Sequence, residues 1–280
     1  MKVLWLYAHP DPRSLNGSLR DAGLRKLDEL GHDYRVSDLY AMGWKATVDS
    51  TDYGDHSAGE RLVVASASQA AYHSGTLSPD VAAEQEKLRW ADTVVVQFPL
   101  WWYGMPAILK GWFDRVFVKG FAYGVTDPAH PGRTLRYGQG PLSGKRVLTV
   151  LTSGSPEAPL GPRGINGELH HVLFPLLHGT FWYTGMSVLP PLAVYAADRL
   201  GEQGYEHYAA LLRRRLESIE DIEPLPYRQQ NSGDYDDNLV LRPDLAPGRS
   251  GLGVHYTGDH PVGDGGHPDD ESQRLRAAAG

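Results

Sequence analysis

The chain has 280 residues, of which 41% are hydrophobic, a formal net charge of −7 and no cysteine. The lack of cysteine excludes disulfides, thiol nucleophiles and thiolate-bound metals, and it fits a cytoplasmic protein. The acidic balance argues against nucleic acid as a partner, since phosphate binding requires a concentrated basic face. No stretch approaches the roughly 20 consecutive apolar residues that a transmembrane helix needs. The opening MKVLWLYAHPD is interpreted as a strand and not as a secretory signal, because no small-residue cleavage site follows it.

β-Branched runs alternate with amphipathic stretches, which is typical of a parallel α/β protein. In the first half of the chain we expect a strand at 3–7, a helix over 15–30, a strand at 34–37, weaker helical character at 60–72 and a helix over 79–91. A strand at 93–98, a helix over 106–117, a surface loop over 124–142 and a strand at 146–151 are expected to follow. The last elements are a helix-like stretch over 170–183 that Pro175 interrupts, a strand at 186–189 and a helix over 204–220. No G-x-G-x-x-G follows the first strand, which favours the flavodoxin-like order 2-1-3-4-5 over the dinucleotide-binding order. The sequence therefore predicts a doubly wound, parallel five-stranded sheet with helices on both faces.

The composition changes near residue 223. From there the chain is rich in Pro, Gly, Asp and Asn and has little periodicity. We expect residues 1–222 to form the flavodoxin-like domain and 223–280 to form a C-terminal extension, either an extended arm or a partly disordered segment. The last fifteen residues are expected to be mobile.

The most informative segment runs from Gln97 to Phe117. A strand ends there in an aromatic loop, and Pro106 then opens a helix. The aromatic residues of the loop are Phe98, Trp101, Trp102 and Tyr103. Open α/β sheets build ligand sites in loops at this end of the strands, and aromatic walls suit a flat, conjugated ligand. A core loop is the alternative interpretation, although two adjacent tryptophans cannot both point inward.

Two other strand ends can contribute to the same site. Residues 9–18 lead into a helix N-terminus, whose unpaired N–H groups suit a phosphate. Ser14, Asn16 and Ser18 add side-chain donors, although Ser14 and Asn16 can also act only as helix caps. Residues 152–155 can offer consecutive N–H donors to a ring that accepts electrons, or they can simply form a tight turn at Gly154.

Three histidines, His170, His171 and His178, raise the question of a metal site. Zinc normally takes three or four protein ligands, and the chain offers no cysteine and no fixed carboxylate spacing beside them. The acidic string at 234–237 is interpreted as a solvated turn. We therefore expect no metal.

Several sequence blocks resemble the NAD(P)H:quinone acceptor oxidoreductases, the DT-diaphorase family of flavodoxin-like flavoenzymes. Besides the segment from Gln97 to Phe117, they are residues 7–16, 37–42, 77–80 with 84–85, 121–123 and 164–168. The blocks follow the family order over about residues 1–225, and residues 251–255 show a weaker similarity.

The resemblance implies a bound flavin, FAD with FMN as the alternative, and NADH or NADPH as co-substrate. His9 and Asn16 match positions that hold the flavin pyrophosphate, and the backbone of 99–103 matches the segment along the isoalloxazine edge. The residues implied to bind the cofactor are His9, Arg13, Ser14, Leu15, Asn16, Pro99, Leu100, Trp101, Trp102, Tyr103, Thr152, Ser153, Gly154, Ser155 and Tyr205. Those implied to act in catalysis are Trp102, Tyr103, Tyr123, Asn166 and Gly154.

This chain departs from the family pattern at several of these positions. Leu15 replaces an aromatic residue, Arg13 a smaller hydroxyl residue, Trp101 a polar residue, Val125 a second tyrosine and Tyr205 an arginine near the adenosine half. More importantly, Leu160 and Asn166 stand where the best-known members have a Tyr and a His assigned to charge relay. Related enzymes that prefer dihydronicotinamide riboside also have Asn at the second position. The hydride donor can therefore be NADH, NADPH or dihydronicotinamide riboside. Hydride transfer leaves negative charge on the flavin pyrimidine. We expect the Gly154 and Ser155 backbone amides to stabilise most of this charge and Asn166 to contribute less. The Arg163 cation is the alternative group for this role.

The implied function is two-electron reduction of quinones by a reduced nicotinamide, with ping-pong hydride transfer and azo or nitro compounds as further substrates. A flavin-bearing electron carrier or redox-sensing interaction protein is the alternative, and a flavin-free binding module is a third possibility. We also expect a homodimer. Besides the resemblance, this rests on Tyr103, Trp112, Phe113 and Phe117, which are many large apolar groups for one exposed loop and helix.

Overall fold

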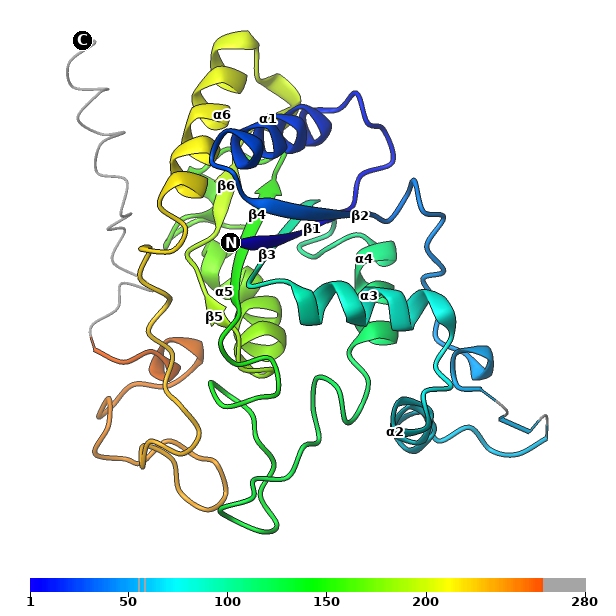
Figure 1. Ribbon diagram of the computed structural model, residues 1–280. Helices are drawn as coiled ribbons and strands as arrows, with labels where there is room; N and C mark the ends of the chain where they lie inside the picture. The colour runs from blue at the N-terminus through cyan, green and yellow to red at the C-terminus, as the bar shows by residue number, and fades with distance from the viewer. Residues whose placement is uncertain (55, 58, 259–280) are drawn as a thin grey trace.

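The computed structural model describes residues 1–54, 56, 57 and 59–258 and shows a doubly wound α/β architecture (Figure 1). The parallel sheet has the order β2-β1-β3-β4-β5, which confirms the flavodoxin-like prediction. Its strands are β1 (Lys2–Tyr7), β2 (Asp33–Asp38), β3 (Thr93–Pro99), β4 (Arg146–Thr152), β5 (Ser187–Val188) and β6 (Leu192–Val194). The predicted mobility of the last fifteen residues concerns a segment outside the described residues.

The fifth position of the sheet differs from the single strand predicted at 186–189. Two short strands share it and pair with opposite ends of β4. β5 pairs with Arg146 and Val147, whereas β6 pairs with the segment 150–152. Pro190 and Pro191 lie between the two strands, and a proline cannot donate to a ladder. The edge of the sheet is therefore divided at these two residues.

Helices cover both faces of the sheet, as predicted. They are α1 (Leu15–Glu29), α2 (Val64–Ser74), α3 (Pro79–Trp90), α4 (Ala107–Val116), α5 (Leu169–Leu176) and α6 (Glu202–Glu217). α1 and α6 cover one face of the sheet, and α3 and α4 cover the other (Figure 1). Trp5 of β1 belongs to the core cluster that contains residues of α1 and α6, and Leu4 and Leu6 belong to the cluster that contains residues of α3 and α4. Burial on both faces explains why the strands are nearly continuous apolar runs. Within the described residues, the helices are all too short or too polar to cross a membrane.

The stretch over 170–183 continues past its proline by changing helix type. Pro175 lies inside α5, and a six-residue π-helix, η3 (Leu177–Trp182), follows directly. Proline lacks the N–H that an α-helix uses, and π-turns inside helices accommodate such disruptions. The change of register turns His178, Phe181 and Trp182 into the protein, where all three are buried.

Residues 223–258 form an irregular arm that packs on η3 and on the loop 124–142. Leu225 N–H donates to the Val188 carbonyl (2.7 Å), Trp182 Nε1 donates to the Arg228 carbonyl (3.1 Å), and Gln230 N–H donates to the Tyr137 carbonyl (3.3 Å). The short 3₁₀ helix η5 (Leu252–His255) lies near the end of this arm. The described part of the extension is thus fixed to the domain by backbone and side-chain contacts.

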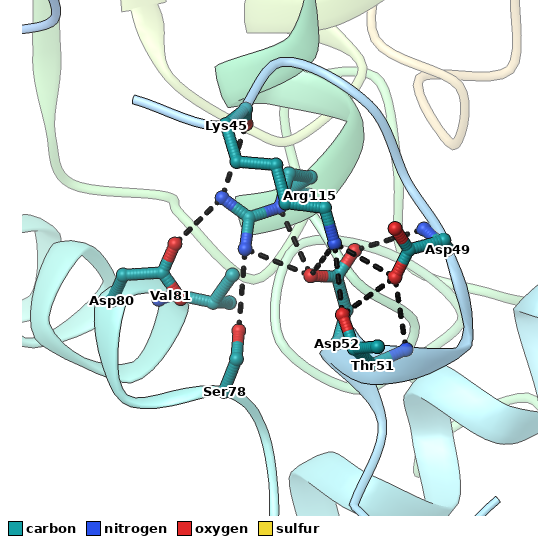
Figure 2. A network of polar contacts seen from close by, with 8 residues as sticks. All are labelled: Lys45, Asp49, Thr51, Asp52, Ser78, Asp80, Val81 and Arg115. Atoms are coloured by element: carbon teal, nitrogen blue, oxygen red, sulfur yellow. Dashed lines mark hydrogen bonds and ion pairs between the residues drawn. The ribbon is translucent and has the colours of Figure 1, made fainter. Parts of the chain in front are cut away.

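A buried ion-pair network fixes α4 to the segment before α2 (Figure 2). The Arg115 guanidinium and the Asp52 carboxylate are each 1% exposed, and Arg115 Nη2 lies 2.8 Å from Asp52 Oδ1. Arg115 Nη1 also contacts Asp80 Oδ2 on α3 (2.7 Å), and Lys45 Nζ reaches Asp52 Oδ1 (3.1 Å). The pKa of Asp80 is lowered because hydrogen bonding and charge from Arg115 outweigh its partial burial. The network sets the position of the helix that follows the aromatic loop.

Candidate active site

The three predicted loops meet at Thr152, the last residue of β4. Its hydroxyl accepts a hydrogen bond from Asn16 Nδ2 in the first loop (2.8 Å). Its carbonyl accepts one from Leu100 N–H in the second loop (2.8 Å). The parallel register places Pro99 opposite Thr152, so the ends of β3 and β4 are level. Residues that are up to 136 positions apart in sequence thus form one edge of the sheet.

The first loop is a tightly folded helix N-terminus. Ser14 caps α1, with its hydroxyl accepting from Gly17 N–H (3.1 Å), and the first turn of α1 contains no acidic residue. A Cβ on Gly17 would lie only 1.9 Å from the Pro12 carbonyl oxygen, so this close approach requires glycine. His9 Nδ1 accepts from Asp11 N–H (3.1 Å). The unpaired backbone N–H groups of the first helical turn and the positive end of the helix dipole together favour an anion here.

Asn16 is the side chain in this loop that is best suited to a bound group. It is 4% exposed, and its Oδ1 has no hydrogen-bond partner among the residues that the structure describes. The Thr152 hydroxyl can both donate and accept. Turning the Asn16 amide by half a turn therefore keeps the contact with Thr152 and points the NH₂ group to where Oδ1 now lies. An unpaired buried amide beside a helix N-terminus fits a flavin phosphate.

Two residues that the sequence did not single out hold Asn16 in place. Gln97 Nε2 donates to the Asn16 carbonyl (2.7 Å), and Trp5 Nε1 donates to Gln97 Oε1 (2.9 Å). All three side chains are buried. Gln97 follows four apolar or β-branched residues in β3, and a glutamine in a buried strand was the available signal, because a buried amide needs partners.

The other predicted residues of the first loop lie at its edge. Arg13 is exposed and pairs with Asp11 (3.1 Å), so its guanidinium does not face the loop interior. Leu15 packs against the core beneath α1. Tyr205 on α6 donates weakly to the Ser18 carbonyl (3.4 Å), which places its ring beside the first turn of α1.

The aromatic loop is a strained two-residue turn. Trp101 and Gly104 exchange two backbone hydrogen bonds (2.9 and 3.0 Å), and Trp102 and Tyr103 between them have φ of 49° and 60°. Positive φ at both positions normally selects Asn or Gly. Trp102 is 97% exposed, and the Trp101 ring lies 6.3 Å from the His9 ring. Such strain in a loop beside a candidate site indicates function.

The third loop offers fewer free donors than predicted. Ser153 N–H donates to the Val194 carbonyl (2.8 Å), and Ser155 N–H donates to Ser153 Oγ (3.2 Å). Gly154 N–H has no partner among the described residues. The turn does not depend on glycine, because φ at Gly154 lies outside the left-handed region and an added Cβ would meet only the end of the Asp198 side chain. The expected run of consecutive donors is therefore wrong, and one backbone donor remains.

Tyr103 and Tyr123 line the same cavity of about 420 Å³. Its other walls come from α4, α5 and the segments next to them, together with the end of β3, and they are mostly apolar. The lining includes Phe98, Met105, Phe113, Phe117, Leu173 and Leu176. Burial raises the pKa of Tyr123, so its hydroxyl stays protonated and can donate a hydrogen bond. The cavity has the aromatic walls and the neutral donor that a planar carbonyl compound requires.

Asn166 connects the second and third loops. Tyr103 OH donates to Asn166 Oδ1 (3.0 Å), and Asn166 Nδ2 donates to Ser155 Oγ (3.0 Å). Leu160 is buried and has no polar atom to offer, and Arg163 is exposed. Three of the predicted site residues are thus joined in one hydrogen-bonded chain.

The histidines considered for a metal site are not arranged as one. His171 lies 4.0 Å from Glu168 on the surface of α5, and His178 is buried among aromatic rings. Across the described residues, no group of three or more His, Asp or Glu side chains is close enough to hold a metal ion.

Comparison with known proteins identifies the family. The profile of the flavodoxin-like fold family matches residues 1–217. The chain is 45% identical over 260 residues to a ribosyldihydronicotinamide dehydrogenase-like protein, traD, of Penicillium crustosum, covering 91% of this chain and 95% of that protein. It is 38% identical over 226 residues to the human ribosyldihydronicotinamide dehydrogenase [quinone], covering 80% and 94%.

Among solved structures, a putative quinone reductase from Klebsiella pneumoniae is 49% identical, with a TM-score of 0.87 and coverage of 91% of this chain and 99% of that one. Since 91% of the chain is covered, the similarity includes part of the segment beyond residue 222. The family profile and the solved structure agree with the flavodoxin-like fold. The chain therefore belongs to the flavodoxin-like family that includes the NAD(P)H and ribosyldihydronicotinamide quinone dehydrogenases.

Proposed function

We propose that this protein is a flavoenzyme that transfers two electrons from a reduced nicotinamide to a quinone. The observation that carries the proposal is the convergence at Thr152 of an anion-binding helix N-terminus and an aromatic turn, beside a cavity lined by two tyrosines. Relatives that are named as quinone dehydrogenases support the same reaction. Azo and nitro compounds are further acceptors, because the cavity selects for planarity.

The first loop, the aromatic turn and Tyr123 have separate roles in the proposed reaction. Asn16 and the first turn of α1 hold the flavin phosphates, with FAD as the favoured cofactor and FMN as the alternative. When bound, the flavin accepts hydride from one planar substrate and returns two electrons to the next. The aromatic turn excludes water and orients both substrates in turn, which gives ping-pong kinetics. The protonated Tyr123 hydroxyl donates to the carbonyl oxygen of the acceptor.

A flavin-bearing electron carrier or redox-sensing protein is the second candidate. It needs no acceptor cavity, so the space beside Tyr103 and Tyr123 disfavours it.

Purified protein should be yellow, and it should oxidise NADH, NADPH or dihydronicotinamide riboside much faster with menadione than without it. Bound flavin without menadione-dependent turnover would indicate the carrier. A colourless protein that does not take up added FAD would indicate a binding module and contradict the proposal.

Flavin retention provides a test of the first loop. Replacing Asn16 and Ser14 by Ala should weaken flavin binding, each lost charge-assisted contact costing roughly 1.5–3 kcal/mol. Asn16→Ala should have the larger effect, because Ser14 Oγ already accepts from Gly17 N–H. Asn238→Ala, in the exposed part of the arm, is the matched control. Equilibrium dialysis measures the loss, and unchanged affinity in the double variant would place the phosphate elsewhere.

We also propose a homodimer with the active site at the interface. The earlier support from Trp112 and Phe113 is wrong, since both side chains are buried in the core of one subunit. The structure offers a different argument, an exposed apolar patch on the two loops beside the site. The patch consists of Trp101, Trp102, Tyr103 and Ile165, and Trp102 and Ile165 are 97% and 96% exposed.

Light scattering tests the dimer. Ile165→Asp should shift the equilibrium toward monomer and lower activity with it, because burying a charge at an interface is costly. Val240→Asp introduces the same charge at an exposed apolar side chain in the arm and should leave the dimer intact. A fully active monomer of the wild-type chain would contradict both the interface and the shared site.

A further inference from the structure

A hydrogen-bonded chain runs from the aromatic turn to the third loop. Tyr103 OH donates to Asn166 Oδ1, Asn166 Nδ2 donates to Ser155 Oγ, and Ser155 Oγ donates to the Pro156 carbonyl, each at 3.0 Å. Every member is neutral, and the chain ends on a backbone carbonyl. In this arrangement each hydroxyl or amide donates to the next member of the chain.

The backbone at Tyr103 is strained in a way that serves this contact. With φ of 60° it lies in the left-handed region, which is unfavourable for a residue with a Cβ. The adjoining Trp102 carries the same strain, and the turn is closed by the two hydrogen bonds between Trp101 and Gly104. This conformation directs the tyrosine hydroxyl onto a side chain that is 63 residues away in sequence.

The contact fixes the orientation of the Asn166 amide. Its oxygen is held by Tyr103 and one of its two N–H hydrogens is held by Ser155, so the second N–H points in a single direction. The segment that carries Asn166 is itself held by Asn166 N–H donating to the Pro159 carbonyl (3.0 Å). Without the tyrosine hydroxyl, the amide can turn about its last torsion and exchange its oxygen and nitrogen.

Few other donors face the third loop. The N–H groups of Ser153 and Ser155 are engaged, Leu160 cannot donate, and the Gly154 N–H is the one backbone donor that remains among the described residues of the loop. We propose that Tyr103 is a positioning residue, whose hydroxyl fixes the free N–H of Asn166 as a donor to the cofactor when negative charge develops on it. This proposal rests on the proposed flavin function. It assigns to Tyr103 a polar role in addition to that of an aromatic wall.

The test compares Tyr103→Phe, which removes one oxygen atom, with Asn166→Ala and the double variant. Each single change should slow flavin reduction by about tenfold, and the double variant should also lose about tenfold, because both changes remove the same donor. The two-electron potential should fall by about 30 mV in each, the equivalent of a tenfold change for this couple. Tyr34→Phe removes a hydroxyl that contacts Asp28 at the far end of the sheet and should change neither quantity.

A second readout requires no cofactor. In flavin-free protein, the side-chain amide resonances of Asn166 should shift and broaden in Tyr103→Phe and stay in place in Tyr34→Phe. Unchanged resonances would overturn the positioning role even if the protein bound no flavin and the proposed function failed. In loaded protein, a wild-type reduction rate in Tyr103→Phe, or a hundredfold loss in the double variant, would overturn the role while leaving the flavin function intact.

Discussion

Replacing Arg115 by Ala should lower the free energy of unfolding by roughly 3–5 kcal/mol, because it leaves a buried carboxylate without its main partner. Arg115 Nε and Nη2 both donate to Asp52 Oδ1 (3.1 and 2.8 Å), and that carboxylate is 1% exposed. The Lys45 ammonium, which lies nearer the solvent, and the Asp49 N–H would then still contact Asp52. The substitution also removes the guanidinium that lies over the Trp44 ring, 4.5 Å from its centroid.

Urea unfolding measures this loss, and Arg133→Ala is the matched control. Arg133 pairs with Asp237 at 3.4 Å on the surface, and exposed pairs of this kind contribute at most about 1 kcal/mol. A double variant with Arg115→Met and Asp52→Asn should be less destabilised than the sum of the two single variants, because no unpaired charge stays buried. A loss below about 1 kcal/mol in Arg115→Ala would show that solvent reaches Asp52 in the folded protein.

Acidification from pH 6.5 to about 4 should destabilise the protein by up to about 3 kcal/mol through His178. Burial, and to a smaller extent the nearby His255, lower the pKa of His178 to about 4. In the unfolded chain this imidazole binds its proton near pH 6.5, whereas in the folded protein it stays neutral. Stability is therefore complete above pH 6.5 and is lost as the pH falls toward the folded pKa.

The rings around His178 explain its low pKa. Phe174 stacks on it at 4.5 Å, Tyr227 and Tyr137 lie at 4.9 and 5.0 Å, and His255 from the arm lies at 5.6 Å. The pKa of His255 is also lowered, by burial and by Arg228. Protonation inside this cluster would put a charge between the arm and the domain.

Unfolding midpoints measured between pH 7.5 and 4.5 test this effect. His178→Phe keeps the stacking and removes the titrating group, so its midpoint should vary less with pH than that of wild type. His207→Gln, on the exposed face of α6, should keep the wild-type slope. Identical slopes for wild type and His178→Phe would show that His178 does not control the acid sensitivity. The lowered aspartate pKa values, such as that of Asp49 at about 2, act below this window.

Much of the fold could be predicted because local and global signals agree. The run at 93–98 predicts a strand that is buried on both faces, and every residue of β3 is buried. Ser14 predicts the start of α1, where it caps Gly17 N–H. β6 escaped prediction because three residues after two prolines carry no periodic signal, and its pairing is set by β4.

The site was predictable as a set of loops, and less so as a set of contacts. Parallel strands bring their carboxyl ends to one edge, so the meeting of the three loops follows from strand order. The bond between Tyr103 and Asn166 does not follow, because it depends on a strained turn that Trp and Tyr rarely adopt. Trp112 was wrongly assigned to a surface for a similar reason. Its indole N–H reaches the buried carboxylate of Glu84 (2.8 Å), a partner that spacing along the chain does not reveal.

The divided edge of the sheet has a consequence for how copies of this protein can associate. A free edge strand is a template for pairing with another chain, and short strands, prolines and charges prevent this. Here β5 and β6 are separated by two prolines, and Leu225 already donates to the Val188 carbonyl. The opposite edge, β2, presents charged side chains at Asp33 and Arg35. Neither margin can template a continuous intermolecular β-sheet, so concentrated protein is protected from fibrillar aggregation while side-chain surfaces stay free for pairing.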